Sequence, residues 1–266
     1  MPAWQVGRYY GVKIINIAPG NAARGLAGLH ASYLLHDANT GQPLAFIDGN
    51  ELTARRTAAA SALAASYIAP PQANRLLVMG GGRIARLLPL AYREVRPVRQ
   101  LRVWTRQPPQ SQALVAFWCE QGLPAQSVQD VRAAVGQADI VSCATLATLS
   151  DAPVVCGAWL GAGSHLDLIG SFAPDMREAD DAAFVDADLY VDAEEALQKS
   201  GELLGPMARG VFAAGDVKAT LAQLCRGERQ PLTHTRRTVF KSVGHALEDL
   251  CAGICAYEAV VGLPPG

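Results

Sequence analysis

The stretch RLLVMGGGRIAR, residues 75–86, decides the fold of this chain. Its mostly apolar first half predicts a buried strand that ends at Met79, the three glycines predict a tight turn, and the following residues predict the start of a helix. The spacing fits G-x-G-x-x-A, the fingerprint of a dinucleotide-binding turn. In that pattern Gly80 makes the turn, Gly82 lets the backbone approach a pyrophosphate, and Ala85 lets the helix pack closely on the strand.

The start of this helix is the predicted phosphate site. The free N–H groups around Arg83 and Ile84, together with the positive end of the helix dipole, favour a bound anion. A structural glycine turn in another kind of α/β protein is the alternative. Because a strand precedes the glycines and a helix follows them, the pattern favours an α/β chain with a Rossmann domain that binds NAD(H) or NADP(H).

The next strand, predicted over residues 101–105, indicates which cofactor is preferred. An NAD-selective site has an acidic side chain near the end of this strand, where it binds the ribose, but residues 104–112 contain no acid. We therefore expect Thr105 and Arg106 to lie near the adenosine ribose, with Arg106 placed to meet a 2′-phosphate. This predicts a preference for NADP(H), with NAD(H) as the alternative; a solvated loop arginine is the other interpretation of Arg106.

A later strand, predicted over residues 165–169, indicates where the reactive end of the cofactor binds. Ligands in open parallel sheets bind at the carboxyl ends of the strands. Ile169 and Gly170 end this strand and are therefore predicted to face the nicotinamide.

Composition limits the class of protein. The 266 residues are half apolar and 18% charged, which suits a large packed core, and the net charge of −1 argues against a nucleic-acid partner. The first residues lack the features of a signal peptide and no apolar run is long enough to span a membrane, so we expect a cytoplasmic protein without a membrane partner. The six cysteines have no metal-binding spacing, so no metal is expected; Cys251 and Cys255 are expected to be buried thiols on one helix face.

The chain ahead of the glycines predicts a small antiparallel sheet. Residues 11–17 form an apolar strand interrupted by Lys13, a position that suits a lysine when its amine reaches a partner. Two further strands within residues 32–47 are joined by a turn-rich segment, as in antiparallel pairing. Thr53 is the predicted N-cap of an alanine-rich helix that extends to Ile68.

Four blocks of the sequence resemble one protein family. They are VKIINIAPGN (residues 12–21), DANTGQPLAFIDGNELTARRTAAASALA (37–64), GSFAPDMREAD (170–180) and FKSVGHALEDL (240–250). In this order they are similar to the ornithine cyclodeaminase/mu-crystallin family, and the resemblance covers nearly the whole chain. It implies a Rossmann domain over residues 71–238. It also implies a smaller α+β domain over residues 1–70 that binds substrate and forms a homodimer, completed by a C-terminal helix within residues 239–266.

The resemblance implies roles for particular residues. Lys13 matches a lysine that contacts the substrate near the reacting carbon, and Arg56 matches an arginine that binds the substrate carboxylate. Thr145 and Leu146 match residues that run under the adenine and ribose. A guanidinium offers a carboxylate two parallel donors, and a nearby ammonium supplies charge or a proton. The alternatives are a solubility lysine on an edge strand, a helix-pairing arginine and a structural loop.

Two departures from the family pattern refine these expectations. Family members carry a longer segment ahead of the VK block, so we expect a shortened first domain. Ornithine cyclodeaminases have an aspartate where Phe172 stands, and a phenyl ring can neither transfer a proton nor hydrogen-bond an ammonium. We therefore predict an NAD(P)H-dependent oxidoreductase that reduces a small cyclic ketimine such as Δ1-pyrroline-2-carboxylate, an imino acid. The alternatives are an ornithine cyclodeaminase, an alanine dehydrogenase-like enzyme, and a crystallin-like protein that binds NADPH without turnover.

Overall fold

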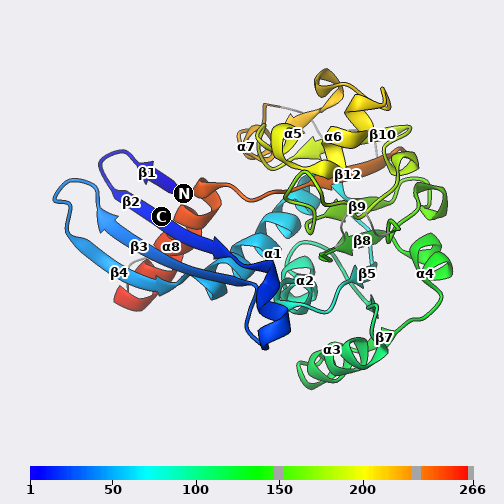
Figure 1. Cartoon of the computed structure of the whole chain (residues 1–266), viewed down its shortest axis with the longest axis horizontal. Coiled ribbons are helices and arrows are strands. Elements are labelled where there is room, and N and C mark those ends of the chain that lie inside the picture. Colours follow the sequence, from blue (N-terminus) through cyan, green and yellow to red (C-terminus); the bar gives the residue numbers. More distant parts are fainter. Residues whose placement is uncertain (147–151, 229–234, 263–266) are drawn as a thin grey trace. The chain divides into compact units, whose positions relative to one another are not determined.

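The chain folds as two compact units. A computed structural model describes residues 1–146, 152–228 and 235–262. Unit 1 comprises Met1–Thr57 together with His245–Gly266, and unit 2 comprises Ala58–Gly244. Unit 1 is therefore built from the first part of the chain together with the C-terminal helix α8 (Ala246–Val261), which Figure 1 shows beside the first strands.

Unit 1 is a four-stranded antiparallel sheet with a helix on one face (Figure 1). The strands lie in sequence order, β1-β2-β3-β4. The elements are β1 (Pro2–Gln5), β2 (Tyr9–Ile17), the 3-10 helix η1 (Pro19–Arg24), β3 (Leu29–Asp37), β4 (Pro43–Asp48) and α8 (Ala246–Val261). The predicted antiparallel pairing of β3 and β4 is confirmed, and β1 is a strand that the sequence did not predict.

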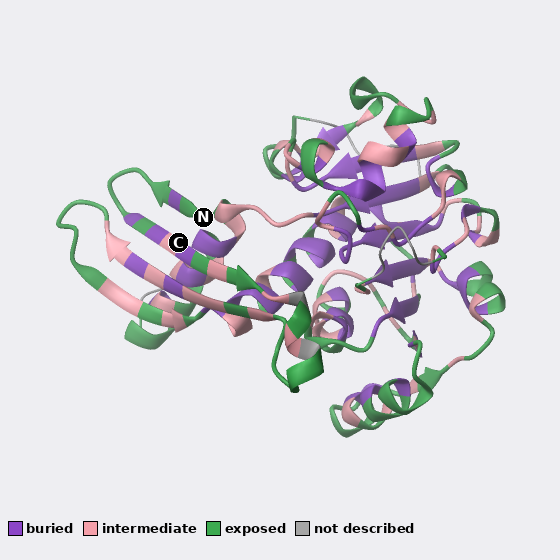
Figure 2. Cartoon of the chain, in the orientation of Figure 1, coloured by how far each residue is buried: buried purple, intermediate pink, exposed green. Residues whose placement is uncertain are grey.

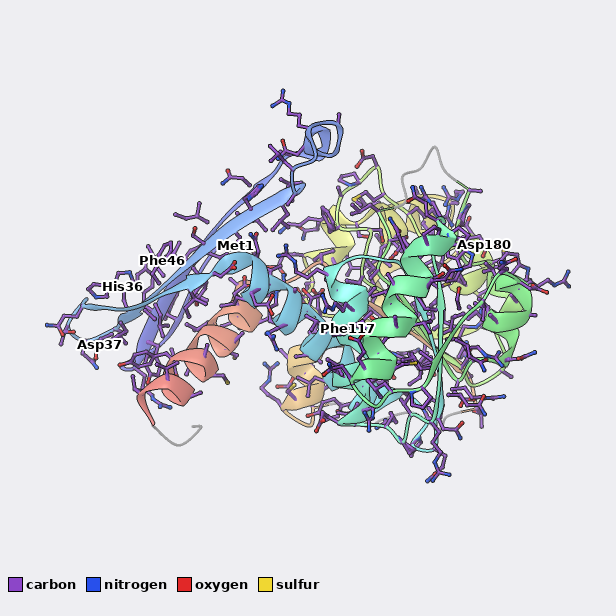
Figure 3. The ribbon with its side chains drawn as sticks, turned by 90° about the horizontal axis from the view of Figure 1, so that it is seen from below. Met1, His36, Asp37, Phe46, Phe117 and Asp180 are labelled. Atoms are coloured by element: carbon purple, nitrogen blue, oxygen red, sulfur yellow. The ribbon has the colours of Figure 1, made fainter. Side chains whose placement is uncertain are left out.

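The two faces of this sheet differ in burial. Tyr33 and Leu35 of β3 are buried in a core that includes Leu250 of α8. The opposite face carries the exposed apolar side chains Trp4, Tyr10, Ile14 and Phe46. We call this surface the apolar sheet face; Figure 3 shows the labelled Phe46, which is 73% exposed, on the side of the sheet away from α8.

Helix α1 (Gly49–Ile68) begins earlier than predicted. The carboxylate of Asp48 accepts hydrogen bonds from the backbone N–H groups of Asn50 and Glu51, and so supplies the partners that the helix start requires. Thr53 lies inside the helix. The prediction that Thr53 is the N-cap is therefore wrong.

The division between the units also lies elsewhere than predicted. It falls between residues 57 and 58 and between residues 244 and 245, whereas we expected it after residues 70 and 238. Helix α1 crosses the first division, and its second half packs in the core of unit 2 through Ala58 and Ala65. The second predicted boundary would cut through β12 (Arg237–Lys241), a strand of the sheet in unit 2.

Unit 2 is an eight-stranded parallel sheet in the order β11-β10-β12-β9-β8-β5-β6-β7. Besides β12, the strands are β5 (Arg75–Met79), β6 (Gln100–Trp104), β7 (Ala125–Ser127), β8 (Ile140–Cys143), β9 (His165–Leu168), β10 (Ala187–Val191) and β11 (Ala219–Thr220). From β5 the chain proceeds first to β6 and β7 on one side, and then to β8 and β9 on the other. This reversal creates the switch point at which doubly wound sheets bind ligands.

Helices cover both faces of the parallel sheet, and its inner strands β8, β9, β12 and β10 are almost entirely buried (Figure 2). The helices are α2 (Arg83–Arg93), α3 (Pro108–Glu120), α4 (Val131–Gln137), α5 (Ala196–Lys199), α6 (Gly201–Ala208) and α7 (Leu221–Cys225), with 3-10 helices η2 (Gly157–Trp159), η3 (Asp181–Ala183) and η4 (Ala214–Asp216). Leu76 and Val78 pack with α1, α2 and α3, whereas Leu77 and Met79 pack with α4 and α6. The predicted fold, a Rossmann domain plus a smaller α+β unit, is confirmed.

Helix α8 corrects one further prediction. Cys251 and Cys255, expected to be buried, are both exposed. Leu250 and Gly253 lie on the buried face of α8 instead, and the two cysteines lie on the face turned away from the core.

Candidate functional site

The glycine turn after β5 is shaped by close backbone contact. Gly80 has a φ of +129°, and a Cβ there would lie 2.4 Å from the carbonyl oxygen of Ala144, so this position requires glycine. Gly82 is the N-cap of α2; no side chain caps the helix, and a Cβ on Gly82 would meet nothing within 4 Å. Ala85 is fully buried beneath the turn. An uncapped helix start beside open space fits a diphosphate.

The carboxyl end of β6 borders a cavity of about 430 Å³. The cavity is lined by Trp104, Arg106, Val131, Ala152, Pro153, Val154 and Trp159. The hydroxyl of Thr105 donates to the carbonyl of Gln107 at 2.7 Å and so fixes its own loop. This end of the strand therefore offers apolar walls with an arginine among them, which suits a flat heterocycle that carries an anion.

Glu178 connects the loops after β8 and β9, and the sequence did not single it out. Its Oε1 accepts from the backbone N–H of Thr145 at 2.7 Å and from the Thr145 hydroxyl at 2.8 Å, and its Oε2 accepts from the N–H of Gly170 at 2.7 Å. The backbone N–H of Ile169 donates to the carbonyl of Cys143 at 2.9 Å. The predicted cofactor residues Thr145, Ile169 and Gly170 are thus brought together at the carboxyl ends of two neighbouring strands.

Buried charged groups lie beneath these loops. Lys241 is fully buried, and its ammonium donates to the carbonyl of Leu168 at 2.8 Å. Burial raises the pKa of Glu178 to about 8 and the pKa of Asp167 to about 6, while the Lys241 ammonium opposes both shifts. Burial lowers the pKa of Lys241 itself. Asp167 accepts hydrogen bonds from the hydroxyl groups of Ser61, Tyr92 and Ser142.

In unit 1, Lys13 and Arg56 share one carboxylate. Lys13 Nζ donates to Asp249 Oδ1 at 2.8 Å, Arg56 Nε donates to the same oxygen at 3.0 Å, and Arg56 Nη1 donates to Glu248 Oε2 at 2.7 Å. The side chains of Lys13 and Arg56 are only 1% and 9% exposed. Burial lowers the pKa of Lys13, and the Arg56 guanidinium lowers it further. Lys13 has the buried partner that the sequence predicted, and the four side chains form a neutral cluster.

Sequence reasoning missed the two acids of this cluster. Glu248 and Asp249 are adjacent in the first turn of α8, and Asp249 is fully buried. A carboxylate on the buried face of a helix requires a cation or several hydrogen-bond donors. An acid at a buried position of α8 is the signal that would have marked Asp249 as needing a cation, although it does not say which cation.

Comparison with known proteins agrees with these features. A sequence model described as the ornithine cyclodeaminase/mu-crystallin family matches residues 1–263. The chain belongs to this family. The family membership predicted from the four sequence blocks is therefore confirmed.

Relatives within this family are named as reductases. The chain is 43% identical over 262 residues to the Δ1-pyrroline-2-carboxylate reductase of Paracoccus denitrificans, covering 97% of this chain and 81% of that protein. It is 33% identical over 248 residues to the ketimine reductase mu-crystallin of Rattus norvegicus, covering 93% and 75%. The solved structure of Thermococcus litoralis Δ1-pyrroline-2-carboxylate reductase in complex with NADH and L-proline is similar with a TM-score of 0.89 and 34% identity, covering 95% of this chain and 78% of that one.

The other residues that the sequence singled out lie at a helix start or in loops. Arg83 and Ile84 are the first two residues of α2, at the uncapped helix start. Leu146 is 72% exposed after β8. Phe172, which the resemblance aligns with an aspartate of ornithine cyclodeaminases, is half-buried after β9. His245 caps α8, with its ring accepting from the N–H of Leu247 at 3.2 Å.

The part of the chain that the structure describes contains neither of two other kinds of feature, a metal site or a membrane-spanning helix. Within residues 1–146, 152–228 and 235–262, no cluster of histidine, cysteine and acidic side chains is placed to hold a metal ion. None of the helices in these ranges combines the length and apolar character needed to cross a membrane.

Proposed function

We propose that this chain is an NAD(P)H-dependent ketimine reductase that reduces a cyclic imino acid, such as Δ1-pyrroline-2-carboxylate, to the cyclic amino acid. The observation that carries the proposal is the buried pair Lys13 and Arg56 in a chain whose relatives at 43% and 34% identity are Δ1-pyrroline-2-carboxylate reductases. Phe172 supports reduction over deamination, because a phenyl ring cannot exchange a proton with an amino group.

In this proposal Arg56 binds the carboxylate of the imino acid. A guanidinium has five N–H donors, and Arg56 uses Nε for Asp249 and one Nη1 donor for Glu248. The other donors are available to bind a planar carboxylate. The incoming carboxylate competes with Glu248, since both are anions that pair with the same guanidinium.

Lys13 is the proposed proton donor. Reduction adds a hydride to the imine carbon and a proton to the imine nitrogen, which yields the amine. A nicotinamide, when bound, supplies the hydride. The lowered pKa of Lys13 makes its ammonium a better acid, and Asp249 orients that ammonium through the 2.8 Å hydrogen bond.

Nucleotide binding is proposed for unit 2, with NADP(H) preferred and NAD(H) as the alternative. The uncapped start of α2 suits the diphosphate, and the cavity beside Trp104 and Trp159 suits the adenine. Arg106 lines the same cavity and would bind a 2′-phosphate through its guanidinium. The absence of an acid in residues 104–112 supports this preference.

Substrate binding and homodimer formation are proposed for unit 1. The apolar sheet face exposes Trp4, Tyr10, Ile14 and Phe46, and large exposed apolar patches mark interaction surfaces. A second copy of the chain is the proposed occupant, because a two-fold dimer buries the same patch on both subunits. We also propose that the protein is cytoplasmic. Phe46→Glu is expected to give monomers in analytical ultracentrifugation. An unchanged dimer would refute the proposal that the apolar sheet face forms the dimer interface.

The experiment that tests the proposed activity uses the whole chain with NADPH or NADH and two imino acids, Δ1-pyrroline-2-carboxylate and its six-membered homologue. We expect oxidation of the cofactor with formation of the cyclic amino acid, detected by absorbance and by chromatography. A folded protein that binds the cofactor but reduces neither imino acid would refute the proposal and leave a crystallin-like binding protein. Formation of proline and ammonia from ornithine would show instead that the chain is an ornithine cyclodeaminase.

A further inference from the structure

We propose that Glu178 is a positioning residue for the nicotinamide cofactor, whose carboxylate fixes Thr145, just after β8, and Gly170, just after β9, relative to the glycine turn after β5. The inference rests on the proposed function for the assignment of these loops to the cofactor. Glu178 is fully buried. It lies in the segment between β9 and η3, outside the strands of the sheet.

Both oxygens of Glu178 are used by groups in the two loops. Oε1 accepts twice from Thr145, through the backbone N–H and the hydroxyl, and Oε2 accepts from the N–H of Gly170. All three distances are 2.7 or 2.8 Å. Backbone N–H groups can only donate, so both oxygens act as acceptors, and the Thr145 donors favour the ionised form of Glu178 against the burial that raises its pKa. One side chain therefore joins two loops that belong to different strands.

The backbone of residues 144 and 145 also lies in close contact with two glycines, Gly80 and Gly170. A Cβ on Gly170 would lie 1.7 Å from the carbonyl oxygen of Thr145, and a Cβ on Gly80 would lie 2.4 Å from the carbonyl oxygen of Ala144. Residues 144 and 145 are thus wedged between the ends of β5 and β9. Because Thr145 is held by Glu178, a shift of that side chain moves the backbone that packs against the glycine turn.

Glu202 holds Glu178 in place. Glu202 Oε2 accepts from the backbone N–H of Glu178 at 2.7 Å and from the Ser171 hydroxyl at 2.6 Å, and Oε1 accepts from the N–H of Ala179 at 2.9 Å. The carbonyl of Glu178 also accepts from the N–H of Val154 at 2.8 Å. Hydrogen bonds therefore hold the backbone of Glu178 as well as its carboxylate.

Asp167 supplies a matched contrast. It is equally buried and also accepts three hydrogen bonds, but its partners are the hydroxyls of Ser61, Tyr92 and Ser142. A hydroxyl can donate or accept, so these partners can rearrange around an amide, whereas two of the three donors to Glu178 are backbone N–H groups that only donate. Replacing Glu178 by glutamine places an amide N–H₂ against such a donor, while Asp167→Asn can be accommodated.

The test compares Glu178→Gln with Asp167→Asn in the full-length protein. We measure the Kd for NADPH and for NADH by nicotinamide fluorescence, the melting temperature, and KM for cofactor and imino acid. Glu178→Gln is expected to raise the cofactor Kd and KM about tenfold, while KM for the imino acid stays unchanged. Asp167→Asn is expected to bind the cofactor with the wild-type Kd, even if the substitution changes the melting temperature of the protein. If Glu178→Gln does not fold, Thr145→Val, which removes one of the three donors, is expected to raise the Kd about threefold.

The outcomes separate this inference from the proposed function. A wild-type cofactor Kd in Glu178→Gln, or in Thr145→Val where only that variant folds, makes Glu178 merely structural and overturns the inference. An equal loss of cofactor affinity in Asp167→Asn also overturns it, because any buried acid would then have the same effect. If the wild type binds cofactor but reduces no imino acid, the proposed function fails and the Kd values alone decide the role of Glu178. If the wild type binds neither cofactor, both fail.

Discussion

The two units stabilise buried charge in different ways. In unit 1, Lys13 and Arg56 are balanced by Asp249 and Glu248, so side chain pairs with side chain. Among the residues of unit 2 that the structure describes, the buried acids outnumber the buried lysine Lys241. Glu178 and Glu202 accept mainly from backbone N–H groups. The difference fits the two tasks proposed above: paired cations in unit 1 that bind an anionic substrate, and carboxylates in unit 2 that fix loops.

The largest expected effect comes from removing the shared acid of unit 1. Asp249→Ala leaves two cations in a buried site without their common partner, which should lower the free energy of unfolding by about 3–5 kcal/mol. Urea denaturation measures the loss. Asp181→Ala is the control, because Asp181 pairs with Arg177 and Arg209 at a partly exposed position, and should cost less than about 1 kcal/mol. Equal losses in both variants would contradict the paired-cation account of unit 1.

The next largest effect is the pH dependence of stability that the buried acid Asp167 gives to unit 2. Burial raises the pKa of Asp167 to about 6 from 3.8. Between pH 3.8 and about pH 6, therefore, the Asp167 carboxyl group is protonated in the folded state and ionised in the unfolded state. The contribution of Asp167 to stability therefore falls as pH rises from about 4 to about 6, by up to about 3 kcal/mol. Asp167→Asn removes this dependence, and urea denaturation across that range detects the difference. Parallel pH profiles for wild type and variant would show that Asp167 is ionised throughout.

A smaller effect concerns cofactor choice in unit 2. Arg106→Ala should weaken NADPH binding about tenfold and leave NADH binding unchanged, because only NADPH carries the 2′-phosphate. Calorimetric titration with each cofactor checks this. Arg102→Ala is the control, since Arg102 donates to Gln137 from within β6, and should change neither affinity. Equal weakening of both cofactors by Arg106→Ala would remove the case for an NADP(H) preference.

The smallest effect tests whether Glu248 competes with the substrate. Glu248→Gln removes a charge that pairs with Arg56 at 2.7 Å, so KM for the imino acid should fall about threefold while the cofactor Kd stays the same. Glu51→Gln, which breaks the exposed ion pair with Arg55, is the matched control and should leave KM unchanged. A raised KM in Glu248→Gln would mean that Glu248 orients Arg56 instead of competing for it.

The local features of the fold could be predicted from sequence because their signals lie within a few residues. The glycine turn at Gly80 and the buried lysine at Lys13 both follow from their immediate neighbours. Thr53 shows the limit of this approach, since Asp48, five positions earlier, caps the helix. The double proline after α1 signalled the helix end at Ile68 but not a domain boundary, because one continuous helix serves both units.

The partners of the candidate site could not be predicted in this way. Lys13 and Asp249 are 236 positions apart, and no local pattern records which strand and helix pack together. Glu178 was missed for another reason: its partners include the N–H groups of Thr145 and Gly170, and every residue except proline has such a group. Only the folded chain shows which backbone groups a carboxylate reaches.

Transfer of the hydride itself is the event that most directly tests the central claim that this chain is a ketimine reductase. The wild-type protein is incubated with Δ1-pyrroline-2-carboxylate and NADPH deuterated at the nicotinamide C4, and the product is examined by mass spectrometry. The expected result is proline with deuterium at the carbon that was the imine carbon. Cofactor that binds but stays reduced, with no labelled proline formed, would contradict it.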